Sequence, residues 1–211
     1  MRHAIAPMFV VLCGILLLQP DPAHAVIIDF APDIQVVDVG TPVDVGVVIS
    51  GLGDGLPPSL STFDLDVSFD PLILLLNNVT YGDPILGDQL NLFGLGSVTL
   101  TTPGAGTVNL FELSLDDPTD IDNLQATAFT LATLRFDTLG VGTSPLGLSI
   151  NALGDADGGP LEADAGHGSI TARATTTEPV IPEPCTGLLL SYGLVGVVLR
   201  RLLRVGHHSR G

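Results

Sequence analysis

Residues 61–71 read STFDLDVSFDP, and this short stretch limits the fold more than any other part of the chain. Apolar and polar residues alternate one by one, and the apolar ones are Phe63, Leu65, Val67 and Phe69. Successive side chains of a β-strand point to opposite faces, so the alternation predicts a strand with one face on a core and the other in water. Pro71 ends the strand, because proline has no amide hydrogen to donate to the ladder.

Residues 41–50 and 107–115 show a similar alternation. In the second segment, the side chains expected on the core face are Phe111, Leu113 and Leu115. Turn-rich segments separate the strands at short intervals, and long helical periodicity is absent outside the two ends of the chain, which predicts an antiparallel, all-β sandwich. Further strands are expected at residues 27–30, 34–39, 73–81, 97–102, 145–153 and 168–172.

The segment FTLATLRFDTL, residues 129–139, also reads as a strand, but its apolar parity changes midway. Phe129 and Leu131 fall on one parity, whereas Leu134 and Phe136 fall on the other. One extra residue in a strand produces such a change, so we expect a β-bulge near Ala132 and Thr133.

The charge of the chain excludes one class of partner. The 211 residues carry a formal net charge of −16, and there is no Lys. Between residues 26 and 199 the only Arg residues are Arg135 and Arg173. Such an acidic surface repels the phosphate backbone of DNA and RNA, and nucleic-acid binding is therefore not expected.

Residues 1–25 have the pattern of a secretory signal peptide. Arg2 precedes an apolar run, and small residues at Ala23 and Ala25 form a cleavage site after Ala25. The alternative is a membrane helix that stays in place. The body between the two terminal segments contains no Cys, so its stability must come from an apolar core and not from disulfides.

A Thr- and Pro-rich linker is expected at residues 174–180, followed by an apolar run at the end of the chain. This run predicts a single transmembrane helix at about residues 185–203, with a short amphipathic or buried helix as the alternative. The uncharged part of this run ends at Leu199, and the arginines at its end are expected to act as a stop-transfer signal: Arg200, Arg201 and Arg204. Cationic flanks stay on the cytoplasmic side, which leaves residues 205–211 as a cytoplasmic tail.

The order of motif, apolar helix and basic end in residues 181–204 resembles the PEP-CTERM sorting signal of Gram-negative, polysaccharide-producing bacteria. The motif is Ile181-Pro182-Glu183-Pro184, with Ile181 where that family usually has valine. The resemblance implies that exosortase, a membrane-embedded cysteine protease, recognises and cleaves this tail. It implies an exported protein that passes through the inner membrane as a single-pass intermediate and ends at the cell surface or in the extracellular matrix.

Residues 26–175 have a resemblance of their own. Segments such as VDVGTPVDVGVVISGLG and LSTFDLDVSFDPLILLLNNVTYGDPILG are similar to successive strands of a cohesin domain, which we place at residues 26–173. The resemblance implies a jelly-roll sandwich of about nine strands, related to carbohydrate-binding modules. The best-known cohesins bind dockerin domains, so a dockerin-like protein or an exopolysaccharide is the expected partner.

Catalytic chemistry is not expected. His167 is the only His of the exported body, which also lacks Cys and Lys, so the sequence offers no Ser–His or Cys–His pair. We expect His167 in a turn, and we assign no catalytic or cofactor-binding residue. Paired carboxylates of a glycosidase are the open alternative among so many Asp residues.

Two short motifs have a structural and a functional interpretation. Asp155 and Asp157 begin like a calcium loop, but the later ligands of an EF-hand are missing, so a turn is favoured. The stretch NNVT, from Asn77 to Thr80, fits a glycosylation acceptor, but a strand edge explains it more simply. We therefore expect no metal residue, although calcium elsewhere on the acidic surface stays open.

The predicted function is a non-catalytic surface or matrix protein, with a carbohydrate-binding module proper as the alternative.

Overall fold

The alternating segment forms strand β4 (Thr62–Ser68) in the computed structural model, which describes residues 25–175. Phe63, Leu65 and Val67 are completely buried. Asp64 and Asp66 lie on the opposite, partly exposed face. The strand and the direction of its side chains are therefore confirmed.

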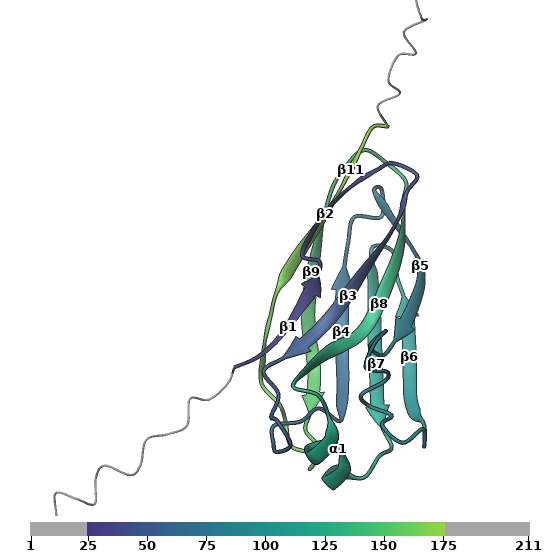
Figure 1. The fold of residues 1–211 in the computed structure, drawn as a ribbon. Coiled ribbons are helices and arrows are strands. Elements are labelled where there is room, and N and C mark those ends of the chain that lie inside the picture. Colours follow the sequence, from purple (N-terminus) through teal and green to yellow (C-terminus); the bar gives the residue numbers. More distant parts are fainter. Residues whose placement is uncertain (1–24, 176–211) are drawn as a thin grey trace, which may run out of the picture. The chain divides into compact units, whose positions relative to one another are not determined.

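Two β-sheets pack face to face, with α1 (Pro118–Leu124) at one end (Figure 1). The five-stranded sheet has the order β10-β1-β3-β8-β5, with β10 (Ala163–Ala165), β1 (Val26–Ala31), β3 (Pro42–Ser50), β8 (Ala128–Thr138) and β5 (Leu74–Tyr81). The six-stranded sheet has the order β2-β11-β9-β4-β7-β6, with β2 (Ile34–Asp38), β11 (His167–Arg173), β9 (Gly142–Gly154), β7 (Thr107–Ser114) and β6 (Ser97–Pro103). The predicted all-β sandwich is confirmed.

The core lies between the sheets and is built from the inward-facing residues of both. Phe136 of β8 is fully buried and meets Phe69 edge to face, with ring centroids 5.1 Å apart. Burial of each such side chain contributes roughly 1.5–3 kcal/mol, and aromatic pairs add to that. Residues 25–175 contain no Cys, so the apolar core holds the two sheets together without a disulfide.

The parity change in β8 is a bulge. Val47 of β3 pairs with Ala132, whereas Val48 pairs with Thr130, so Leu131 is the extra residue. Leu131 and Ala132 are both buried, which is how one strand keeps its apolar residues inside on both sides of the bulge. The predicted bulge is confirmed to within one residue.

Two elements were not predicted from the sequence. The helix α1 is short, and its N-cap is Asp117, whose side chain accepts a hydrogen bond from the Thr119 amide at 3.0 Å. Pro118 opens the helix and Ile121 buries its apolar side chain. The other element, β10, is a three-residue strand that pairs in parallel with β1.

Several predicted segments lie outside the described residues. They are residues 1–24, which include Ala23, residues 176–180 of the linker, the motif Ile181–Pro184, the helix with Arg200, Arg201 and Arg204, and the tail 205–211. Ala25, at the predicted cleavage site, is the first described residue and is exposed. Within residues 25–175, no helix has the length and apolar character needed to cross a membrane.

Candidate functional site

The outer face of the six-stranded sheet is exposed to water, but part of it carries apolar side chains. On β6, Val98 and Leu100 are 48% and 57% exposed. Each lies opposite an apolar residue of β7, since Val98 pairs with Leu113 and Leu100 pairs with Phe111. Four apolar side chains therefore form one patch on the solvent face, which we call the β6–β7 patch.

This patch corrects the sequence prediction for β7. Phe111, Leu113 and Leu115 were expected on the core face, but Leu113 and Leu115 are exposed and Phe111 is only partly covered. The residues that face the core are Val108, Leu110 and Glu112. Both faces of β7 carry apolar residues, so alternation within the strand alone cannot decide which face is buried.

Beside the patch lies a network of carboxylates and amides on β4, β7 and β9. Asn109 Nδ2 donates to Asp64 Oδ1 at 2.6 Å and to Asp66 Oδ1 at 2.9 Å. Asn151 Nδ2 donates to Asp64 Oδ1 at 3.1 Å and to Asp66 Oδ2 at 3.0 Å. The two amides thus hold the two aspartates in one orientation on the sheet surface.

The register of the sheet produces this arrangement. Asp66 lies directly opposite Asn109 in the β4–β7 ladder. On the other side of β4 the ladder shifts between Asp64 and Leu65, which leaves Asn151 of β9 as the extra residue. The bulge turns the Asn151 side chain toward the aspartates.

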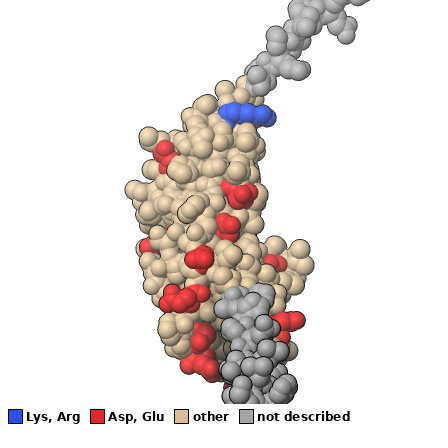
Figure 2. Space-filling view, turned by 90° about the vertical axis from the view of Figure 1, so that its left-hand side faces the viewer, with Lys and Arg blue, Asp and Glu red and all other residues tan. Residues whose placement is uncertain are grey.

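The network keeps Asp66 charged. Hydrogen bonds from Asn151 and then Asn109 lower the pKa of Asp66 below its usual value, against a smaller opposing effect of burial. Asp64 and Asp66 have no cation beside them in the described chain, because Arg135 pairs with Asp44 at 3.6 Å and Arg173 with Asp38 at 2.7 Å. On the side shown in Figure 2, cationic side chains form one patch near one end, whereas carboxylates are scattered along the molecule.

Together, the β6–β7 patch and the Asp64–Asp66 pair give the outer face of this sheet an apolar part and an anionic part. Contiguous exposed apolar area is typical of interaction surfaces, and fixed carboxylates add orientation and specificity to them. Such a surface fits a partner that presents aliphatic side chains next to Lys or Arg.

The other residues singled out from the sequence have structural roles. Asp155 caps a turn, with Oδ1 accepting from the Gly159 amide at 2.6 Å, so the turn interpretation is confirmed. Asn77 lies on edge strand β5, and its Nδ2 donates to Asp137 Oδ2 at 2.9 Å. His167 was expected in a turn but begins β11. Within residues 25–175, no three His, Cys, Asp or Glu side chains are grouped closely enough to hold a metal ion.

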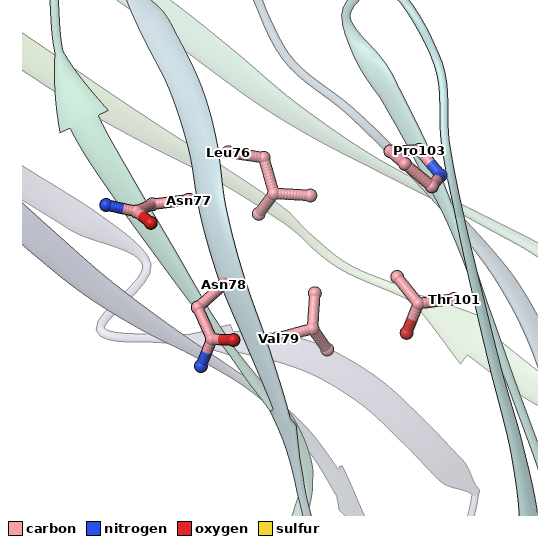
Figure 3. Close-up of a pocket in the computed structure, with 6 residues that line it drawn as sticks. All are labelled: Leu76, Asn77, Asn78, Val79, Thr101 and Pro103. Atoms are coloured by element: carbon pink, nitrogen blue, oxygen red, sulfur yellow. The ribbon is translucent and has the colours of Figure 1, made fainter.

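A small pocket of about 280 Å³ opens where the edge strands β5 and β6 of the two sheets face each other. Leu76 and Val79 point across it toward Thr101 and Pro103, whereas the amide of Asn77 points away (Figure 3). Its lining combines apolar side chains with the polar residues Asn77, Asn78 and Thr101, and it contains no charged group.

Tyr81 is the one aromatic residue with a hydroxyl in the described chain, and it is engaged within the domain. Its ring stacks on Phe63 with centroids 6.3 Å apart. Its hydroxyl donates to the Leu100 carbonyl at 2.8 Å and lies 2.9 Å from Thr101 Oγ1. The ring is therefore not presented as a flat platform for a sugar.

Comparison with known proteins bears on the fold. No protein-family model matches the chain, and no curated protein sequence does. Solved structures do match. The seventh ScaB type I cohesin from Pseudobacteroides cellulosolvens aligns with a TM-score of 0.56 at 16% identity, covering 76% of this chain and 98% of that one.

Two further structures agree. The sixth cohesin of scaffoldin B from Acetivibrio cellulolyticus, solved in complex with a mutant Cel5 dockerin, has a TM-score of 0.55 at 18% identity and covers 71% of this chain and 99% of its own. A non-cellulosomal cohesin from the archaeon Archaeoglobus fulgidus has a TM-score of 0.53 at 15% identity, covering 72% and 94%. The β-sandwich of this protein therefore has the fold of cohesin domains.

Proposed function

We propose that this protein is an exported, non-catalytic surface or matrix protein whose cohesin-like domain binds a partner protein through the outer face of the six-stranded sheet. The observation that carries the proposal is the exposed β6–β7 patch beside the oriented Asp64–Asp66 pair. Single exposed apolar residues are common on folded proteins, but a contiguous apolar patch bordered by polar groups is typical of an interaction surface.

The partner we propose is a dockerin-like domain. Among the similar structures, the Acetivibrio cellulolyticus cohesin was solved in complex with a dockerin, and so was a cohesin from Clostridium thermocellum with a TM-score of 0.55. At 18% and 13% identity these likenesses support the kind of partner and not its sequence. The anionic half of the face further favours a partner with Lys or Arg at its centre.

The route to the surface is proposed from the sequence. The signal peptide would direct export, and the motif around Glu183 would present the tail to exosortase. Proline disfavours a helix at and just before its own position, so Pro182 and Pro184 would favour an extended motif, which suits a segment that a protease must grip.

A capture experiment with identified partners tests the binding face. Full-length protein is immobilised and exposed to the exported proteins of its host, and each captured protein is then purified and its Kd measured. The variants are Leu100→Ser and the double change Asp64→Asn with Asp66→Asn. We expect each to weaken binding at least about tenfold, as removal of an interface anchor does.

The matched control is Leu75→Ser, because Leu75 is 52% exposed on the other sheet, close to the 57% of Leu100. Binding should be unchanged in this variant. If Leu75→Ser and Leu100→Ser weaken binding equally, or if neither does, the proposed face is wrong. Retention on exopolysaccharide with no protein partner would instead favour the carbohydrate-binding alternative, which no feature of the described residues favours at present.

A further inference from the structure

The side chain of Glu112 places a carboxylate inside the sandwich, between the two sheets. It lies on the inner face of β7, and its side chain is 1% exposed. Oε1 accepts a hydrogen bond from Ser97 Oγ at 2.6 Å. Oε2 is buried and has no hydrogen-bond partner among the described residues. A buried charged oxygen without a partner is costly, so its presence requires an explanation.

A second carboxylate, that of Asp88, interacts with Glu112. Asp88 belongs to the segment of residues 82–96, which we call the β5–β6 loop, and its Oδ2 lies 3.4 Å from the same Ser97 hydroxyl. A serine hydroxyl has only one hydrogen to donate. With both carboxylates ionised, the cluster of Glu112, Asp88 and Ser97 therefore has one hydrogen too few and one negative charge too many.

The pKa of Glu112 agrees with this geometry. Burial raises it to about 7, the Ser97 hydrogen bond opposes the rise, and the charge and hydrogen bonding of Asp88 add to it. Among residues 25–175, Tyr81 of β5 is a further titratable group close enough for the charge of Glu112 to raise its pKa. On the far side of β7, β4 places Phe63 opposite Glu112 and turns its aspartates outward.

We propose that Glu112 and Asp88 share one proton, and that this proton fastens the β5–β6 loop to β7 and to the start of β6. Protonated Glu112 supplies the missing hydrogen to Asp88, while Ser97 donates to Glu112 Oε1. A metal ion is the other way to neutralise two carboxylates. Within residues 25–175, no third carboxylate, His or Cys lies in the cluster to complete a metal site. A shared proton is therefore favoured over a metal ion.

The position of Asp88 explains how the proton would act on the loop. Asp88 Oδ1 accepts from the Leu90 amide at 2.9 Å, and Leu90 is buried in the core. The backbone of Asp88 also packs closely on Gly82. Loss of the proton would leave two like charges facing each other without solvent, and the loop with Ser97 would move outward to hydrate them.

Hydrogen exchange of the full-length chain in mild detergent tests this proposal. Exchange rates are first corrected for the intrinsic effect of pH. Protection of the backbone amides in residues 83–98 should then fall at least about tenfold between pH 5.5 and pH 8.5, because a group with a folded-state pKa of about 7 loses its proton in that range.

Glu112→Gln is the informative variant, since its amide can donate to Asp88 and accept from Ser97 at every pH. We expect its protection to stay constant over the same range. Asp88→Asn removes the charge of the other carboxylate, and with it the repulsion of Glu112. Protection in this variant should also lose most of its pH dependence. The matched control is Glu162→Gln, an exposed Glu, which should respond to pH as the wild type does.

Three outcomes would overturn the proposal. The first is wild-type protection that does not change with pH. The second is equal pH dependence in the wild type and in both Asp88→Asn and Glu112→Gln, and if Glu112→Gln does not fold, Asp88→Asn decides alone. The third is restored protection at pH 8.5 on addition of millimolar Ca²⁺ to the wild type but not to Asp88→Asn, which would show a cation in place of the proton.

Discussion

The side-chain amide of Gln125 forms two hydrogen bonds with the backbone of Leu60. Its Oε1 accepts from the Leu60 amide at 2.7 Å, and its Nε2 donates to the Leu60 carbonyl at 2.8 Å. Both residues are buried, although 65 positions separate them in the chain. This pair ties the residue after α1 to the segment before β4.

Gln125→Leu should destabilise the domain by about 3 kcal/mol, because the amide and the carbonyl of Leu60 would both be left buried without a partner. The free energy of unfolding from urea titrations measures the loss. The control is Asn123→Ala, which removes an exposed hydrogen bond to Thr119 and should change stability by less than about 0.5 kcal/mol. Equal effects of the two changes would contradict this role of Gln125.

Gly106 and Gly87 separate the effect of backbone conformation from that of space, because both have φ of +78°. A Cβ at Gly106 would lie 2.8 Å from the Phe69 carbonyl oxygen, whereas one at Gly87 would meet nothing within 4 Å. Gly87→Ala should therefore cost about 1 kcal/mol from conformation alone, and Gly106→Ala about 2 kcal/mol more. Similar midpoints of thermal unfolding for the two variants would be inconsistent with the tight turn at Gly106.

Asp83 should make the domain sensitive to strong acid. Its pKa is lowered to about 2, mainly by the hydrogen bond from the Leu86 amide, with further bonds from Thr130 and Ile85. A carboxylate with a lowered folded-state pKa stabilises the fold above its unfolded pKa, and that stability is lost as pH falls from about 4 to about 2.

Asp83→Asn should reduce this dependence, since an amide does not titrate. Unfolding midpoints in urea between pH 2 and pH 6 measure it, and Asp157→Asn in an exposed turn serves as the control. Stability from Asp83 is lost between about pH 4 and pH 2, below the range of pH 5.5 to 8.5 expected for Glu112, so the two effects can be told apart. Identical acid profiles for Asp83→Asn and the wild type would show that other groups dominate.

Glu183→Ala should block processing of the tail in the native host. Immunoblots of the cell and medium fractions would show a longer form that stays in the membrane fraction, with the β-sandwich still folded. Glu178→Ala is a close control, because Glu178 also precedes a proline. It lies before the motif, so normal processing is expected. Normal processing of Glu183→Ala would argue against recognition by exosortase.

A second sorting prediction concerns the basic end. Arg200 and Arg201 changed together to Ala should weaken retention in the membrane and lower the amount of processed protein, since they are expected to act as a stop-transfer signal. Fractionation and immunoblotting measure both. Unchanged retention and trimming would remove that role from the two arginines.

Most of the sandwich could be predicted because alternation within a strand reports burial directly. β4 shows this best, since Phe63 and Leu65 are buried and Asp64 points out, as its pattern indicates. In β7 the same reasoning failed, because the choice between its two apolar faces depends on β6 and on the cluster around Glu112. Those contacts are set by the packing of the sheets and leave no periodic signal in the strand itself.

The candidate site was only half visible in the sequence. Outward-facing Asp64 and Asp66 follow from the pattern of β4, but Asn109 and Asn151 join them through a strand register and a bulge. Pairings between residues more than 40 positions apart cannot be read from local spacing. The helix α1 left a usable local signal, since Asp117-Pro118 is a typical beginning of a helix.

The place of β11 has a mechanical consequence. This strand leads to Arg173 and the rest of the chain, and it lies between β2, which runs parallel to it, and β9, which runs antiparallel. A pull on the chain beyond Arg173 acts along the strand, so the hydrogen bonds to both neighbours bear the load together and not one after another. A domain tethered through this strand would yield only when both ladders shear at once.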